Sequence, residues 1–495
     1  MVIFNFSINL VVRNVKLSQE VVGTRASFSV VCGTNKYFTE ISQSETVLNE
    51  TNVYFRHVCQ VPYRFDRSNS VLIKIYAVRA DGLFAGEIGR CSFDLASLMM
   101  NKCRLNFPQN GIDAEVNLLD VDKYSNGIQL QFHGEHIHSP NSLPLASYYY
   151  LVLHFPSRDV LLYKSEIIKL EKDPKWKAFV VPSHLMEVFP TATLRVYCYN
   201  YNINSEDSII GMFETTVSRL LQGIGPINTY MLINTSGERI DEKTCFQLSL
   251  FNLRKLPSFF DAVNQGMHVP ITLGVDMTAS NGNPNNTDSL HYIHPHTSHY
   301  PTPYEMALNY VVPSVTKHQA NRNIGVVGFG AYIPPNHSFS QCFNLSGNSA
   351  TANVDGLQGV LEAYSQARLV VQPFAPTEYA DVIYHVAKFA KAESKRRLGL
   401  YFVLVVFTNG GITNSRRTID AIVDSAPHPM SIVFVTLGKE HFPEIEKLES
   451  ASLKHSDGRL LCRSIVSVVP ASDLQNNDGL ALIPLHVGSY FAGGL

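Results

Sequence analysis

Residues 271–280 read Ile-Thr-Leu-Gly-Val-Asp-Met-Thr-Ala-Ser, an apolar run that ends on Asp276 and continues into a short polar loop. A run of this length and composition is typical of a strand that is buried on both faces of a sheet. Similar runs recur further along the chain and alternate with helical patterns, which predicts a parallel sheet covered by helices. The other expected strands are 324–330, 400–408 and 432–437, and the expected helices cover about 304–315, 354–367, 377–392 and 416–424.

The chain before this region has a different texture, with short β-rich runs separated by turn residues. Two stretches, 45–55 and 166–176, share a spacing: a Glu, then Asn or Asp seven residues later, then an aromatic residue three further on. Many short strands are typical of β-sandwiches, and the repeat indicates two of them in tandem. The predicted fold class is therefore two all-β sandwiches, at 1–133 and 134–256, followed by a Rossmann-like α/β domain at 257–495.

Composition limits the classes of function. The 495 residues are 45% apolar and 17% charged, which is typical of a chain that buries large cores. The formal net charge of −2 disfavours nucleic acid as a partner, because proteins that bind it along their length are normally strongly basic. Eight scattered cysteines without a CxxC pair indicate reduced thiols and an intracellular protein. We find no apolar run of the roughly 18 residues that a membrane-spanning helix needs.

The C-terminal half carries several linked motifs in a fixed order. They lie at 275–284, 288–293, 328–335, 376–379, 385–389 and 429–432. These motifs closely resemble the copine family. The resemblance implies two tandem C2 domains followed by a von Willebrand factor A-like domain, and a protein that binds phospholipid membranes in response to calcium. It also implies recruitment of protein targets through the A-like domain, in the cytoplasm and at the cytosolic face of the plasma membrane, with the nucleus as a second candidate location.

The loop after the first α/β strand is a candidate metal site. One carboxylate and two hydroxyls, from Asp276, Thr278 and Ser280, stand at alternate positions at a strand end, where open α/β sheets bind ligands. Such oxygens can converge on a hard divalent cation, and a partner's carboxylate can complete its shell. The alternative is that Asp276 and Ser280 only cap a helix or turn.

The copine resemblance extends this site. It identifies the loop as a metal-ion-dependent adhesion site for Mg²⁺ or Mn²⁺ and adds Thr377 as a separate threonine ligand. Relatives read Thr-Asp-Gly after the central strand, whereas this chain reads Thr408-Asn409-Gly410. Asn409, expected to act through water, keeps an oxygen but lacks the full negative charge. We therefore expect weakened rather than abolished metal binding.

The two sandwiches lack the aspartates that the resemblance leads us to expect. C2 domains that bind calcium gather about five aspartates from two loops, because Ca²⁺ takes 6–8 oxygen ligands. In the second sandwich Asn200 and Asn202 replace the Asp-x-Asp pair, and Glu206 and Asp207 are the acids left. In the first, the loops offer only Glu20 and Asp81. We predict that neither sandwich binds Ca²⁺ tightly, with Asn200, Asn202 and Asp207 as weak residual candidates.

Membrane contact could persist without calcium. Five lysines surround Trp176, the chain's single tryptophan, and we expect three of them, Lys164, Lys175 and Lys177, on two paired strands. Lysines on adjacent strands can form a basic face for an anionic phospholipid membrane. The predicted lipid-binding residues are Lys164, Lys169, Lys175, Trp176 and Lys177. The alternative is an ordinary solvated face, since Glu166, Glu171 and Asp173 are interspersed.

These observations favour a non-enzymatic adaptor at a membrane surface, without a small-molecule substrate, whose calcium dependence is doubtful. Two alternatives stay open: a calcium-independent soluble scaffold that does not bind lipid, and a metal-dependent hydrolase. The hydrolase needs a base or second carboxylate near Asp276, and Asn409 occupies the obvious position. A cluster of four histidines, at 291, 294, 296 and 299, suggests zinc, but prolines make its loop irregular and no cysteine is near, so we expect structural or incidental roles.

Overall fold

The computed structural model describes most of the chain and divides it into two compact units. Unit 1 comprises Met1–Asp122, Phe260–His268 and Pro313–Ala320, and unit 2 comprises Lys123–Phe259, Val269–Val312 and Asn321–Leu495. The described residues are 4–16, 18, 20–31, 37–101, 104–109, 112–119, 126–140, 144–155, 158–182, 193–202, 205–255, 259–294, 300–319, 322–396, 399–438, 443–450, 452–474 and 479–493.

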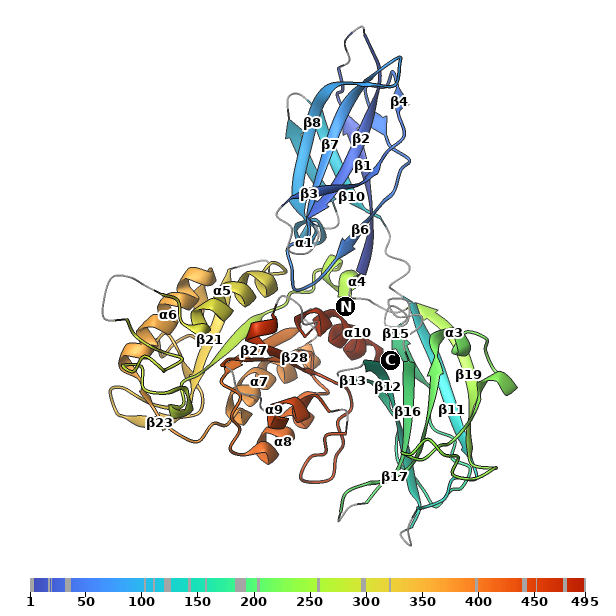
Figure 1. Ribbon diagram of the computed structural model, residues 1–495, viewed down its shortest axis with the longest axis vertical. Helices are drawn as coiled ribbons and strands as arrows, with labels where there is room; N and C mark the ends of the chain where they lie inside the picture. Colours follow the sequence, from blue (N-terminus) through green and yellow to red (C-terminus); the bar gives the residue numbers. More distant parts are fainter. Residues whose placement is uncertain are drawn as a thin grey trace. The chain divides into compact units, whose positions relative to one another are not determined.

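Unit 1 contains the first β-sandwich, drawn in blue in Figure 1. One sheet has the order β5-β1-β10-β9 with β6 also on β1, and the other has β3-β2-β7-β8 with β4 also on β2. All pairs are antiparallel, and buried and partly exposed side chains alternate along β7, as expected for a strand with one face on the core. The elements are β1 (Phe4–Arg13), β2 (Val21–Val31), β3 (Phe38–Gln43), β4 (Val47–Leu48), β5 (Val53–Tyr54), β6 (Cys59–Tyr63), β7 (Ser70–Arg79), β8 (Phe84–Asp94), α1 (Leu95–Met100), β9 (Arg104–Gln109) and β10 (Ile112–Leu118).

Unit 1 also includes two segments that the sequence assigned to the α/β domain. Residues 260–268, in and after α4 (Phe259–Asn264), place the Phe260 ring 4.5 Å from that of Phe6, centroid to centroid. In residues 313–320, His318 stacks on Phe65 at 4.4 Å. The expectation that everything from residue 257 packs in the α/β domain is therefore corrected, because these aromatic contacts bind both segments to the first sandwich.

Unit 2 begins with the second β-sandwich. Its sheets have the orders β15-β11-β19-β18 and β13-β12-β16-β17, with β14 also on β12. Strand β11 starts at Asn126 and pairs along its length with β19, so the predicted boundary between residues 133 and 134 lies too late. The elements are β11 (Asn126–Glu135), β12 (Ala146–Phe155), β13 (Arg158–Lys164), β14 (Ile168–Lys169), β15 (Phe179–Pro182), β16 (Thr193–Asn200), β17 (Ser208–Thr216), α3 (Val217–Leu220), η1 (Pro226–Asn228), β18 (Thr229–Met231) and β19 (Cys245–Lys255).

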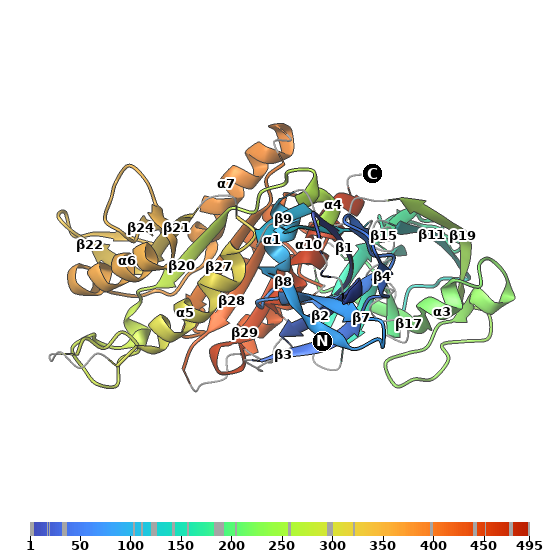
Figure 2. The same ribbon diagram turned by 90° about the horizontal axis from the view of Figure 1, so that it is seen from above.

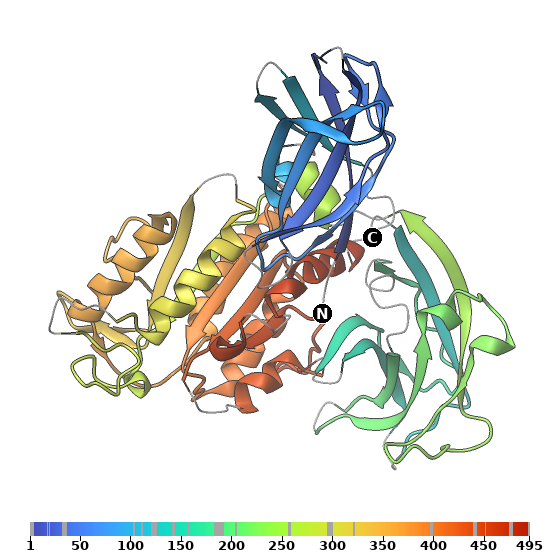
Figure 3. The ribbon, with the colours of Figure 1, turned by 45° about the horizontal axis from the view of Figure 1, so that its top comes forward.

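The rest of unit 2 is an α/β domain, and with it the predicted fold class is confirmed. Its main sheet has the order β24-β21-β20-β27-β28-β29. Strands β21, β20, β27, β28 and β29 run parallel, while β24 and β25 pair antiparallel with β21. Helices lie on both faces of this sheet (Figure 2 and Figure 3). The main-sheet strands are β20 (Ile271–Asp276), β21 (Asn323–Phe329), β24 (Phe343–Asn344), β25 (Asn353–Asp355), β27 (Phe402–Thr408), β28 (Met430–Thr436) and β29 (Val466–Pro470).

The helices follow the predicted pattern, with starts displaced by at most a few residues. A separate small sheet has the order β23-β22-β26. Of the helices in the described residues, none is long and apolar enough to cross a membrane. The remaining elements are η2 (Ala279–Asn281), α5 (Pro303–Thr316), β22 (Ala331–Ile333), β23 (Ser338–Ser340), α6 (Gly356–Val370), β26 (Gln372–Pro373), α7 (Ala380–Arg396), α8 (Ser415–Ser425), α9 (Pro443–Glu446), η3 (Lys447–Glu449), η4 (Ala471–Asp473), η5 (Leu480–Leu482) and α10 (Ile483–Gly493).

Within unit 2 the second sandwich packs against the α/β domain. Tyr148 and Tyr150 of β12 belong to the same buried cluster as Leu461 and Ile465, which precede β29. The backbone N–H of Leu161 on β13 donates to Ser464 Oγ at 3.0 Å. The outer face of the sheet that contains β12 and β13 therefore packs against the α/β domain inside unit 2, and we call it the internal contact face.

Candidate functional site

Asp276 stands at the carboxyl end of β20, in the middle of the parallel sheet between β21 and β27. Its side chain is fully buried, and burial raises its pKa, although hydrogen bonds from two threonines oppose that effect. The Thr278 hydroxyl donates to Asp276 Oδ1 at 2.6 Å, and the Thr408 hydroxyl donates to Oδ2 at 2.6 Å. The carboxylate is thus held by neutral donors on both oxygens.

The hydroxyls extend outward from this carboxylate as a chain. Thr278 Oγ1 is hydrogen-bonded to Ser280 Oγ at 2.7 Å, and Thr377 Oγ1 donates to Thr278 Oγ1 at 3.2 Å. Thr278 and Thr377 are buried, whereas Ser280 is exposed. The structure therefore brings together Asp276, Thr278, Ser280 and Thr377, and the cluster reaches solvent at Ser280.

Two residues at the end of β27, Thr408 and Asn409, also bear on this site. Asn409 is half-buried, and its Oδ1 accepts a long hydrogen bond of 3.3 Å from Gly411 N. Its binding of a metal ion through water stays a prediction. The sequence patterns do not mark Thr408 as a site residue, although its hydroxyl donates directly to the Asp276 carboxylate. The parallel register, in which Val275 pairs with Phe407, places the next residues of both strands side by side. Pairing of the two strand ends is the signal that could have identified Thr408.

Buried side chains behind Asp276 fix its backbone. His291 Nε2 lies 2.8 Å from the Asp276 carbonyl oxygen, and His291 Nδ1 lies 2.9 Å from the Tyr364 hydroxyl. Burial lowers the pKa of His291 to about 4, so the ring is neutral and donates to the carbonyl while accepting from Tyr364. This is the structural role expected for His291. Residues 296 and 299 lie outside the described residues.

The donor set fits a hard divalent cation. One carboxylate and three hydroxyls are oxygen ligands of the kind that Mg²⁺ and Mn²⁺ accept. A cation would also offset the cost of keeping the Asp276 carboxylate charged in a buried position. The described residues contain no group of three His, Cys, Asp or Glu that could hold a metal. Asp276 also caps the turn that follows it, as in the alternative role, because Thr278 N donates to Asp276 Oδ1 at 2.9 Å.

The residual calcium-loop residues of the second sandwich are engaged within the chain. Asn200 is fully buried, and its Oδ1 accepts from Ala146 N at 2.7 Å. Asn202 N donates to Asp207 Oδ1 at 2.7 Å. The Asp207 carboxylate also accepts from the Tyr148 hydroxyl at 2.7 Å and forms an ion pair with Lys454 at 3.0 Å.

The predicted basic lipid-binding face needs two corrections. Trp176 is fully buried between the two sheets, with its ring stacked on Phe246 at 4.9 Å, so it is a core residue and does not contact lipid in this structure. Lys164 belongs to the sheet of β12, whereas Lys175 bridges His133 in the opposite sheet, so the expected pairing of their strands is wrong.

The lysines themselves then divide into two groups. Lys164 lies 5.3 Å from the ring centroid of Tyr148, and burial lowers its pKa to about 7. It is therefore part of the internal contact face of unit 2. Lys169, Lys175 and Lys177 are exposed, and they remain the residues on which a lipid-binding prediction can rest.

Comparison with known proteins places this architecture in a class. The C2 domain profile matches residues 135–232, and the Copine profile matches residues 289–486. Together with the two sandwiches and the α/β domain, these matches define a protein that combines C2 domains with an A-like domain. The chain belongs to the copine family.

Similar solved structures include single domains and tandem arrangements. "BON1-C2B" is 16% identical, covering 27% of this chain and 95% of that one with a TM-score of 0.23. The two tandem C2 domains of Extended-Synaptotagmin 2, calcium bound, are 13% identical, covering 51% and 98% with a TM-score of 0.20. The manganese-loaded TRAP protein of Plasmodium vivax is 12% identical, covering 45% and 74% with a TM-score of 0.27. At these scores the likenesses carry no functional argument.

Proposed function

We propose that this protein is an intracellular peripheral-membrane adaptor, which binds anionic phospholipid through its C2-type sandwiches and recruits protein targets at the strand end of its A-like domain. Membership of a family with C2 domains supports membrane lipid as a general partner. The observation that carries the recruitment step is the convergence of Asp276 with the hydroxyls of Thr278, Ser280 and Thr377. We expect this lipid binding to be independent of calcium, because the sandwich loops lack the cluster of aspartates that a calcium site needs.

The chain's residues would share the work at the strand end. Bound Mg²⁺ or Mn²⁺ would supply a positive charge to which an acidic side chain of a partner can attach. Asp276 would supply the charge that retains the cation, and Thr408 would keep that carboxylate in place through its donated hydrogen bond. Ser280, exposed at the outer end of the hydroxyl chain, would mark the position from which a partner approaches.

Lipid binding is assigned to the exposed lysines of the second sandwich, Lys169, Lys175 and Lys177. Each lysine near an anionic surface contributes about 1 kcal/mol, equivalent to roughly a fivefold change in affinity. Acidic neighbours, Glu171 and Asp173, are exposed beside them and reduce this attraction. The expected binding is therefore modest and salt-dependent.

Vesicle sedimentation of the full chain tests the adaptor. Vesicles of phosphatidylserine and phosphatidylcholine are expected to retain the protein equally in calcium and in chelator, and pure phosphatidylcholine is not. Replacing the three lysines by glutamine is expected to release the protein, whereas Lys243→Gln, an exposed lysine elsewhere on the sandwich, serves as the matched control. Absence of sedimentation under every condition would favour the soluble scaffold instead.

A metal-dependent hydrolase gains no support from the geometry. Within the described part of the chain, the partners of the Asp276 side chain are hydroxyl, amide and backbone N–H groups rather than a second carboxylate or a base. A non-catalytic role is therefore part of the same proposal. Turnover of a phosphate ester by the Mg²⁺-loaded chain, lost in Asp276→Ala, would contradict it.

A further inference from the structure

The loop end of the second sandwich holds a positively charged group that comes from the α/β domain of the same unit. Lys454 lies in a short hairpin between β28 and β29, closed by the bridge between Lys454 and Leu460. Its ammonium group reaches the loop that joins β16 to β17, where the sequence keeps Asn202 and Asp207 as residual calcium candidates. The contact joins residues 247 positions apart.

Three oxygens surround this ammonium group. Lys454 Nζ donates to the carbonyl oxygen of Asn202 at 2.7 Å, to Asp207 Oδ1 at 3.0 Å and, at the longer distance of 3.5 Å, to the carbonyl oxygen of Ser205. The Tyr201 ring centroid lies 4.8 Å from Nζ, which adds a cation–π contact. Carbonyl and carboxylate oxygens that point at one position form a cation-binding arrangement, and here a lysine fills it.

The arrangement is sheltered, which separates it from an ordinary surface ion pair. The Asp207 side chain is 8% exposed and that of Lys454 is 21% exposed. The other Asp207 oxygen, Oδ2, accepts from the Tyr148 hydroxyl, so both carboxylate oxygens are satisfied. Removing Lys454 would leave a nearly buried carboxylate without its ion-pair partner, with only the longer-range interaction with the Lys164 ammonium group in its place. That is unfavourable unless another cation replaces Lys454.

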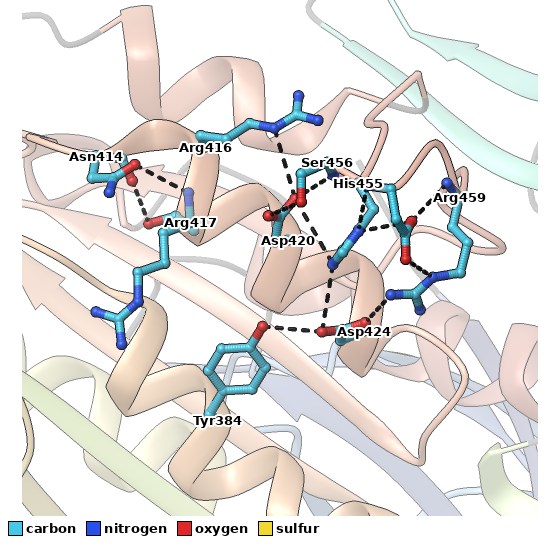
Figure 4. A network of polar contacts seen from close by, with 11 residues as sticks. Tyr384, Asn414, Arg416, Arg417, Asp420, Asp424, His455, Ser456 and Arg459 are labelled. Carbon is cyan, nitrogen blue, oxygen red and sulfur yellow. Dashed lines mark hydrogen bonds and ion pairs between the residues drawn. The ribbon is translucent and has the colours of Figure 1, made fainter. Parts of the chain in front are cut away.

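Helix α8 also holds the hairpin, and Figure 4 shows Ser456 and Arg459 of the hairpin beside Asp420 and Asp424 of α8. Ser456 donates from its backbone N–H and its hydroxyl to the two oxygens of Asp420, at 2.7 and 2.6 Å. Arg459 forms an ion pair with Asp424 at 2.8 Å. Because these contacts set the position of the hairpin without using Lys454, the lysine is presented to the loop by a rigid support.

A glycine permits the close approach of hairpin and loop. Gly458 has a φ of +91°, and a Cβ atom added there would lie 2.7 Å from the hydroxyl oxygen of Tyr201. A larger residue would suffer both backbone strain and this clash. Both hairpin residues therefore lie against Tyr201: Gly458 leaves room for its hydroxyl, and the Lys454 ammonium group forms a cation–π contact with its ring.

We propose that the loop end of the second sandwich is a cation site whose resident cation is the ammonium group of Lys454, supplied by the chain in place of a metal ion. When the lysine is removed, this site would bind a hard metal cation, coordinated by the Asp207 carboxylate and the carbonyl oxygens of Asn202 and Ser205. In the intact protein the Lys454 ammonium group occupies the position that calcium would take, so this loop end is closed to calcium. The inference does not depend on the proposed function at Asp276.

Terbium luminescence, excited through neighbouring tyrosines, tests the site in the full chain. Tb³⁺ is a hard trivalent cation that prefers oxygen ligands, and Tyr201 stands beside the position it would take. All variants carry Asp276→Ala, so that the strand-end site does not contribute. Lys454→Met is expected to give a saturable rise in sensitised emission that the parent lacks, and adding Asp207→Asn is expected to remove it.

Two further variants separate a cation site from general damage. Lys447→Met removes an exposed lysine of the same domain and is expected to leave the titration unchanged. Gly458→Ala is expected to displace the hairpin and produce part of the emission while Lys454 is still present. Identical titrations of the parent and Lys454→Met, with native circular dichroism in both, would overturn the proposal. New emission that survives Asp207→Asn would overturn it as well.

Discussion

The two polar ends of unit 2 contain similar groups in different electrostatic arrangements. At the strand end, the Asp276 carboxylate accepts hydrogen bonds from the neutral hydroxyls of Thr278 and Thr408. At the loop end, the Asp207 carboxylate faces the ammonium group of Lys454. Neutral donors hold a carboxylate in place without cancelling its charge, whereas an ammonium group cancels it. We therefore expect the partner of the carboxylate, more than the number of oxygens, to decide whether an end can take an external cation.

The largest expected effect follows from removing the strand-end carboxylate. Asp276→Ala is expected to weaken Mg²⁺ binding by at least about 100-fold, because loss of a ligand exceeds the 10–100-fold cost of losing an outer-shell partner. Titration calorimetry of the full chain measures it. Asp288→Ala, which removes an exposed acid of the same polar loop, is the matched control. Equal affinities of wild type and Asp276→Ala would show that the strand end does not bind Mg²⁺ through the Asp276 carboxylate.

The next effect concerns Lys164, which lies on the same sandwich as Asp207. Its pKa falls to about 7 because of burial, below the ordinary value of 10.5, so the unfolded chain binds the proton more tightly. Stability should therefore rise as the pH increases from about 7 towards 10, by about 2–3 kcal/mol after allowance for partial exposure.

Urea denaturation at several pH values checks this expectation for Lys164. Lys164→Met is expected to flatten the dependence between pH 7 and 10. Lys169→Met, at an exposed position on β14, is the control and should retain the wild-type slope. If Lys164→Met keeps that slope too, the internal face does not hold a lysine whose charged form is destabilised.

A smaller effect is expected from the neutral donor on the neighbouring strand. Thr408→Val removes the hydrogen bond to Asp276 Oδ2 and is expected to cost about 1.5–2 kcal/mol of unfolding free energy, since the acceptor is a buried carboxylate. Thr408→Ser keeps the hydroxyl and should lose much less. Denaturant titration of the three proteins measures the difference. A Thr408→Val protein as stable as wild type would show that Asp276 does not need this donor.

The smallest expected change sharpens the strand-end site itself. Asn409→Asp adds a negative charge beside the hydroxyl chain and is expected to raise the affinity for Mg²⁺ by about fivefold, or about 1 kcal/mol. Calorimetry compares it with wild type. An unchanged affinity would place residue 409 too far from the cation to act, even through water.

Much of the fold could be predicted because its signals are local. The apolar run 271–276 became β20 at the same residues, and the pattern at 304–315 became α5 over Pro303–Thr316. The loop after β20 was recognised for the same reason, since its carboxylate and hydroxyls are close in sequence. The domain boundary was less predictable, because β11 shows its membership of the second sandwich only by pairing with β19.

The sequence by itself determined the layered fold, the copine resemblance and the shortage of aspartates in the sandwich loops, because periodicity, motif and composition are properties of the chain. Tertiary structure decided which groups meet. Thr408 reaches Asp276 across 132 positions, and Lys454 reaches Asp207 across 247. It also turned Trp176 into the core, away from the neighbouring exposed lysines. The sign of the charge beside each carboxylate depends on these distant contacts, and local sequence patterns do not contain them.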